Sequence, residues 1–184
     1  MWCWASSAEM VLSYIGIQLP QEQIVNHIKG FIVNQPGSVF DMVGSVNSVI
    51  KDINENDVVV SGQYVLGAPL TNVVYNHLKN KKPVILTYQG NYNIGHAVVL
   101  TGINVTNKSS NNGQVSVDEV HVFDPFPYVT RRGPYGQVEY ILNDSLKHRI
   151  YKVSPGYNGN VQLKDSRNMN VGRITGMIFV DGTR

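Results

Sequence analysis

The sequence predicts an α+β fold, in which a helical lobe of about residues 1–80 precedes a mostly antiparallel β lobe of about residues 81–184. Before residue 80, apolar residues recur mostly at helical spacing, whereas runs of β-branched residues between turn residues dominate after residue 83. A chain of 184 residues of which 42% are apolar can bury a substantial core, which excludes a disordered protein. We therefore expect one domain whose two lobes share a cleft.

Four helices are expected, because apolar residues stand three or four positions apart in four segments. These segments are residues 3–15, 20–29, 39–53 and 69–80. The third predicted helix carries Phe40 on its inward stripe and contains Gly44, a residue type that destabilises helix interiors. The fourth begins at a proline and is expected to turn Leu70, Val73 and Leu78 inward.

Strands are expected where β-branched and aromatic residues cluster between turn residues. Two short strands fall within the first lobe, at residues 58–60 and 63–66. The second lobe contributes strands at residues 83–88, 96–103, 114–123, 149–153 and 173–180. A polar loop at residues 104–113 joins two of these strands, which we therefore expect to form a hairpin.

Charge and composition exclude several classes of protein. The 15 Lys and Arg residues against 13 Asp and Glu give a net charge of +2, which is too balanced for a nucleic-acid-binding protein. No window approaches the roughly 20 apolar residues of a membrane-spanning helix. Charged residues make up only 15% of the chain, and neutral polar residues take their place. This composition fits an exported protein, so we expect secretion, with a signal segment outside this sequence.

The single cysteine excludes an intrachain disulfide framework and any zinc site built from several cysteines. The sequence contains no H-E-x-x-H motif and no close His and Cys cluster, so no metal is expected. No glycine-rich loop follows a strand in the way that phosphate binding requires, and no cofactor is expected. A lone cysteine is most often a small packing residue and only sometimes a nucleophile, so its position decides.

Cys3 stands at the start of the first predicted helix. Unpaired backbone N–H groups and the positive end of the helix dipole there favour a thiolate, which is the nucleophilic form. A backbone N–H at a helix start can also stabilise the oxyanion that forms when a carbonyl is attacked. Alternatively, Cys3 packs beside Trp2 and Trp4, and its position alone does not choose between the two interpretations.

His96 opens a buried strand, and Asp124 closes another directly before Pro125. A titratable group at the mouth of an apolar strand has a hydrogen-bond partner or a catalytic role. In the predicted hairpin, the start of the first strand faces the end of the second, so His96 and Asp124 are expected to be neighbours. A Cys-His-Asp relay requires that arrangement, although Asp124 could instead cap the turn at Pro125.

The segments around these three residues, in the order Cys, His, Asp, resemble the papain-like cysteine peptidases. They are most similar to the bacterial branch that includes the C39-type and C70-type (AvrRpt2-like) peptidases. The matching stretches are residues 2–12, 95–102 and 123–125. The resemblance implies a papain-like fold and a thiol protease that hydrolyses peptides or proteins through a thioester acyl-enzyme. It implies Cys3 as nucleophile, His96 as general base and acid, and Asp124 as the residue that orients His96.

Several readings of the same site stay open. Papain-like folds with this triad also support deamidation, transglutamination and cell-wall amide cleavage, and a catalytically silent binding module would keep the fold. An amino-terminal-nucleophile hydrolase is disfavoured, because removal of Met1 would expose Trp2. The family usually carries an oxyanion-hole glutamine several residues before the cysteine. Only two residues precede Cys3 here, so this sequence does not contain that donor.

Three tyrosines flank the catalytic segments and are expected to line the cleft for a peptide substrate. They are Tyr88, Tyr92 and Tyr128. Tyrosine combines a large apolar surface with a hydroxyl group, which suits peptide recognition, although tyrosines are also ordinary packing residues.

Overall fold

The computed structural model describes residues 2–51, 54–69, 71–90, 94–107, 115–156 and 160–183. The helices of this part of the chain are α1 (Cys3–Tyr14), α2 (Gln21–Lys29), α3 (Val39–Ser45), α4 (Thr71–Lys79) and the 3-10 turn η2 (Asp144–Leu146). The strands are β1 (Ser48–Lys51), β2 (Asp57–Leu66), β3 (Val84–Gly90), β4 (Gly95–Asn107), β5 (Val115–Phe123), β6 (Tyr128–Arg132), β7 (Val138–Leu142), β8 (His148–Pro155), β9 (Val161–Lys164) and β10 (Asn170–Thr183). The predicted α+β class with a mostly antiparallel sheet is confirmed.

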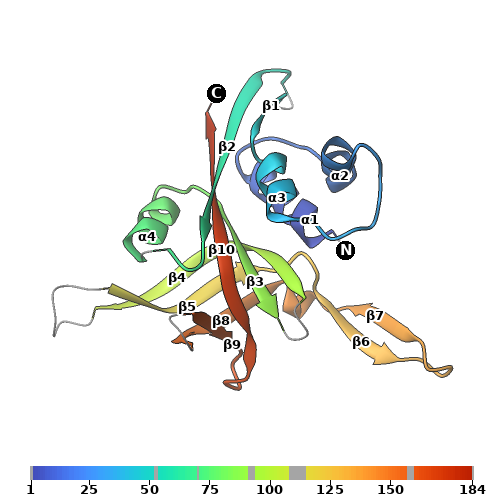
Figure 1. The fold of residues 1–184 in the computed structure, drawn as a ribbon, viewed down its shortest axis with the longest axis vertical. Coiled ribbons are helices and arrows are strands. Elements are labelled where there is room, and N and C mark those ends of the chain that lie inside the picture. Colours follow the sequence, from blue (N-terminus) through green and yellow to red (C-terminus); the bar gives the residue numbers. More distant parts are fainter. Residues whose placement is uncertain are drawn as a thin grey trace.

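One large sheet forms the body of the molecule, with strands in the order β1-β2-β10-β3-β4-β5-β8-β9 (Figure 1). Neighbouring strands in this sheet are antiparallel. Strand β9 also pairs with β10, so the six strands from β10 to β9 close into a ring of hydrogen-bonded neighbours. Closure removes free edges from this part of the sheet and encloses an apolar interior.

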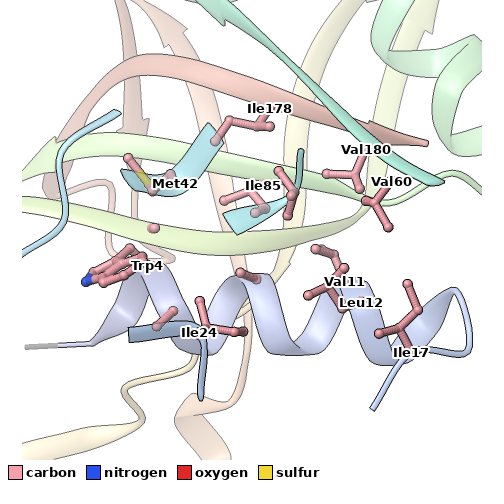
Figure 2. Packing of buried hydrophobic residues seen from close by; sticks show 14 of the residues in the cluster. Trp4, Val11, Leu12, Ile17, Ile24, Met42, Val60, Ile85, Ile178 and Val180 are labelled. Atoms are coloured by element: carbon pink, nitrogen blue, oxygen red, sulfur yellow. The ribbon is translucent and has the colours of Figure 1, made fainter. Parts of the chain in front are cut away.

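The outer face of the sheet is covered by helices α1 to α3, as Figure 2 shows for α1. The buried side of α1 contains Trp4, Ala8 and Leu12 at helical spacing, and these residues join a cluster with Ile85 of β3 and Ile178 of β10. The apolar periodicity that predicts this helix therefore also fixes which side packs on the sheet.

A second cluster fills the space inside the ring of strands. Leu86, Val98 and Val122 belong to it, together with Val74 of α4, and all are buried. Ile85 and Leu86 are consecutive in β3 and belong to opposite clusters, because side chains alternate between the faces of a strand. Strands β3 and β4 are thus buried on both sides and form the central support of the site described below.

The predicted helix over residues 39–53 is wrong beyond Ser45, because the segment 48–51 is strand β1, which pairs with β2. Asn47 ends the helix: its side-chain amide donates to the carbonyl oxygen of Gly62 at 2.7 Å and accepts from the Gly62 N–H at 3.1 Å. These bonds compete with continued helix. Phe40 is 87% exposed, contrary to its predicted inward position.

Smaller differences concern the ends and faces of other elements. The segments 58–60 and 63–66 form one continuous strand, β2, and β4 extends to residue 107 into the predicted polar loop. In α4 the buried residue is Val74 rather than Val73, and Leu70 lies outside the described residues. Strands β6, β7 and β9 were not predicted from the sequence, because each has only four or five residues and gives a weak local pattern.

The expected boundary near residue 80 does not divide the sheet. Strand β2 precedes that position and pairs along its length with β10, which ends near the carboxyl terminus of the chain. Long-range pairing of this kind leaves no local sequence signal, because the two strands are more than a hundred residues apart.

Candidate active site

Cys3 is the first residue of α1, and within the described residues no side chain caps that end of the helix. The thiol is partly buried and not in a disulfide. The first N–H groups of a helix have no partner inside the helix, so they remain available to an anion at this position. The start of α1 is fixed on the sheet by Ser7, whose hydroxyl donates to the carbonyl oxygen of Ala97 in β4 at 3.1 Å.

The two tryptophans beside Cys3 attach the helix start to the loop between α2 and α3, which forms part of the cavity wall. The indole N–H of Trp2 donates to the carbonyl oxygen of Val33 at 2.7 Å, and that of Trp4 donates to Gln35 at 3.4 Å. Gly37 lies so close to the ring of Trp4 that a Cβ atom there would clash with it. Cys3 itself packs against the same core cluster as Trp2 and Trp4, so the helix start that carries the thiol is held in place.

His96 lies at the start of β4, directly opposite Tyr88 of β3 in the register. Its Nε2 is 2.8 Å from Oδ1 of Asp124, and its side chain is 20% exposed. The ring is also within hydrogen-bonding reach of the Cys3 thiol. Because Asp124 occupies Nε2, Nδ1 is the ring nitrogen that is left for a hydrogen bond with the thiol.

Asp124 follows the last residue of β5 and is 2% exposed. Its Oδ1 accepts both from His96 and from the backbone N–H of Phe126, the latter at 2.9 Å. Its Oδ2 lies 3.1 Å from Nε of Arg149 in β8. The backbone N–H of Asp124 donates to the carbonyl oxygen of Lys147 at 2.7 Å. A buried carboxylate with this many partners has a fixed orientation.

The electrostatics of the pair favour a thiolate next to an imidazolium. Burial acts to lower the pKa of His96, but hydrogen bonds and charge interactions with Asp124 and Cys3 outweigh it and raise that pKa to about 9. Burial acts to raise the pKa of Cys3, but His96 and the backbone N–H groups of Ala97 and Trp4 outweigh it, so the pKa is lowered. Each group thus stabilises the charged form of the other.

A cavity of about 700 Å³ opens beside Cys3 and His96. Apolar side chains such as Trp2, Met42, Ile94 and Phe126 line most of it. Its walls come from the start of α1, from α3 and from the ends of β3 and β4, so it lies between the helices and the sheet. A cavity of this size accommodates a few amino-acid side chains.

The structure separates the three tyrosines predicted to line the cleft. Tyr88 lines the cavity, is buried, and its ring meets the ring of His96 edge to face at 5.4 Å. Tyr128 does not line the cavity but packs at 4.7 Å on Phe126, which does. Tyr92 lies outside the described residues. Burial raises the pKa of Tyr88, so its phenol stays neutral.

The hairpin that places His96 near Asp124 is present as predicted, with Val99 opposite Phe123 in the register of β4 and β5. Sequence reasoning missed Arg149, which contacts the second oxygen of Asp124. Its position follows from the pairing of β8 with β5, where Arg149 is opposite Val122. A predicted strand at residues 149–153 was the only available signal, and it did not specify a partner.

Two further findings concern other functional classes. Across the described ranges, no three His, Cys, Asp or Glu side chains group in a way that could hold a metal ion. In the same part of the chain, every helix is too short or too polar to cross a bilayer.

A comparison with protein families gives one match: the model of the Peptidase_C39 like family covers residues 1–153 of the 184. The matched part contains Cys3, His96 and Asp124, together with Arg149. No curated protein sequence matches the chain.

Proposed function

The chain belongs to the Peptidase_C39 like family, and from this premise we propose that it is a cysteine peptidase in which Cys3, His96 and Asp124 form the catalytic triad. One observation carries the proposal: His96 binds Asp124 through Nε2 and also interacts with the thiol of Cys3 at a helix start. A nucleophile, a base and a residue that orients the base are the three parts that nucleophilic acyl transfer needs.

In the proposed reaction, the Cys3 thiolate attacks the carbonyl carbon of the scissile peptide bond. The oxyanion that forms accepts a hydrogen bond from the backbone N–H of Cys3, which has no partner inside the helix. His96 then donates its Nδ1 proton to the leaving nitrogen, the C–N bond breaks, and a thioester remains on Cys3. Water attacks the thioester while His96 accepts a proton, and the C–S bond breaks to release the acid and regenerate the thiolate.

Asp124 acts in this scheme by orienting His96 and stabilising its protonated form. It receives the Nε2 hydrogen bond, which leaves Nδ1 for proton exchange with the reacting groups. Asp124 itself does not need to take up the proton. Because Asp124 is buried, water does not compete for this hydrogen bond.

The substrate class proposed is a peptide or protein with an apolar side chain close to the scissile bond. The apolar lining of the cavity beside Cys3 supports this choice. Tyr88 would support the wall under the bound chain, and Tyr128 would act through Phe126. The finer resemblance to C70-type peptidases rests on the same three sequence segments and predicts the same chemistry. Secretion is proposed from the low share of charged residues.

The test is the cleavage of a mixed peptide library, read by mass spectrometry. The wild-type chain should cut next to apolar residues, Cys3→Ser should lose activity by at least about 10⁴-fold, and His96→Ala should fall similarly. His27→Ala is the matched control, because His27 is an exposed histidine on α2, and it should keep full activity. Release of ammonia, or formation of an isopeptide bond, without cleavage would replace peptidase by deamidase or transglutaminase. Full activity in Cys3→Ser would contradict the triad.

A further inference from the structure

We propose that Arg149 is a positioning residue of the triad, which holds the second carboxylate oxygen of Asp124 and balances its negative charge. The inference rests on the proposed function, because it concerns how Asp124 serves His96. Arg149 lies in β8, 25 residues after Asp124, and is neither part of the triad nor part of the cavity lining.

The two oxygens of Asp124 are held by different parts of the fold. Oδ1 accepts from Nε2 of His96 and from the N–H of Phe126, whereas Oδ2 lies 3.1 Å from Nε of Arg149. A carboxylate held on one oxygen can still rotate about its Cβ–Cγ bond, but one held on both cannot. Arg149 therefore fixes the plane of the carboxylate and, through it, the direction in which the ring of His96 points.

The backbone makes this arrangement rigid. In the register of β5 and β8, Val122 is opposite Arg149, and the N–H of Asp124 donates to the carbonyl oxygen of Lys147 at 2.7 Å. The single N–H of Arg149 Nε donates to the carbonyl oxygen of Leu146 at 2.9 Å, which holds the guanidinium beside Oδ2 of Asp124 as an ion pair. Arg149 is only 27% exposed, which limits screening of the ion pair by water.

The charges around the site also require a second cation. The thiolate of Cys3 from α1 and the imidazolium of His96 form one pair, and the carboxylate of Asp124 adds a negative charge that is 2% exposed. The other titratable groups that face the site are Tyr88 of β3 and Tyr151 of β8, and burial raises the pKa of both phenols, so they stay neutral. The guanidinium of Arg149 supplies a second positive charge. The two negative charges, on Cys3 and Asp124, are then balanced by two positive ones.

This balance has a consequence for the reaction. An unbalanced carboxylate would hold the proton of His96 more tightly and make His96 a poorer acid toward the leaving nitrogen. With Arg149 in place, Asp124 orients the ring while its buried negative charge remains paired. An arginine suits this role better than a lysine because its guanidinium is planar and always charged.

The test uses three variants of Arg149 in the full chain. Arg149→Met removes charge and donors, Arg149→Gln keeps a donor without charge, and Arg149→Lys keeps the charge without the planar guanidinium. For each, the pH profile of Cys3 alkylation by iodoacetamide and the pH profile of kcat are measured. Arg167→Met is the matched control, because Arg167 forms an exposed ion pair with Asp165 in a turn.

Loss of the cation should favour the protonated forms of Cys3 and His96. In Arg149→Met and Arg149→Gln, the rising limb of the alkylation profile and the falling limb of the kcat profile should therefore both move upward by about one pH unit. In Arg149→Met, kcat should also fall about tenfold, a part of the 10²–10⁴-fold that acid–base catalysis contributes. Arg149→Lys should keep both limbs near their wild-type positions while recovering only part of kcat. Arg167→Met should match the wild type throughout.

The possible failures can be told apart. If Arg149→Met does not fold, Arg149→Gln still tests the charge, because its amide can donate to Asp124. Wild-type limbs and wild-type kcat in Arg149→Gln would overturn the inference while Cys3→Ser remains inactive. Activity that survives in Cys3→Ser would instead overturn the proposed function, whatever the Arg149 variants do.

Discussion

Asp124 and the β6–β7 hairpin follow one another in the chain, yet the fold holds them in opposite ways. Asp124 is 2% exposed and bonded through its backbone and both carboxylate oxygens. In the part of the chain that the structure describes, β6 and β7 pair only with each other, and Figure 1 shows them extending away from the main sheet. Tyr140 in this hairpin is 61% exposed.

The difference shows which part of the molecule has a fixed geometry. Asp124 follows β5 where the closed ring of strands brings β4 and β8 to its two sides, so both of these strands contribute a partner to it. The chain leaves that ring at Phe126 and returns to it at η2. Between these points, each described strand of the hairpin pairs with one other strand, β6 with β7. Substitutions should therefore have large effects at Asp124 and small ones in the hairpin.

The largest expected effect is on catalysis by Asp124→Asn. The NH₂ group of the amide must face either His96 Nε2, which favours the wrong tautomer, or the guanidinium of Arg149, which is a cation and cannot accept its hydrogen bond. We expect kcat to fall by about 10³–10⁴-fold while the chain still folds. Steady-state kinetics with a cleaved library peptide measure it, and circular dichroism checks the fold. Near-normal turnover would assign the orienting role to another residue.

The next effect concerns stability. Asp124→Ala leaves Arg149 without its carboxylate in a largely buried position, which should lower the free energy of unfolding by about 3–5 kcal/mol. Asp144→Ala is the matched control, because Asp144 pairs with Lys147 at an exposed site and should cost less than about 1 kcal/mol. Urea denaturation measures both. Equal losses in the two variants would show that the buried ion pair of Asp124 stabilises the fold no more than an exposed one.

The third prediction is a pH dependence. Because the pKa of His96 is raised to about 9, the imidazolium is present below that value and is lost as the pH rises through it. The rate should therefore hold at neutral pH and fall about tenfold per unit above pH 9, since the leaving nitrogen then lacks its acid. A pH–rate profile tests this expectation. A fall that begins near pH 6.5 would mean that Asp124 does not stabilise the charged ring.

The smallest effect is expected in the hairpin. Tyr140→Ala removes an exposed ring whose contact with Phe126, at 5.8 Å between centroids, is worth about 0.5–1.5 kcal/mol at most. The free energy of unfolding should change by less than about 1.5 kcal/mol, and the rate of Cys3 alkylation should not change. Tyr135→Ala serves as the reference variant, because Tyr135 lies at the turn of the hairpin and is 95% exposed. A large loss of alkylation in Tyr140→Ala would show that the hairpin supports the site.

Much of the candidate site could be predicted because it depends on local patterns. Helical periodicity places Cys3 at the start of α1, and the order of two strands around one loop places His96 beside Asp124. Both inferences need only residues that are near in sequence or joined by a single turn. The same patterns failed at Asn47, where a side-chain bond to a distant strand ends the helix.

The sequence by itself thus determined the class of the fold, the helix that carries the thiol and the hairpin that carries the histidine and aspartate. Only the tertiary structure decided that β2 joins β10, that β9 closes the ring, and that Arg149 reaches Asp124. These contacts link segments separated by a hairpin or by most of the chain. Their register depends on the packing of both faces of the sheet, which no single segment of sequence encodes.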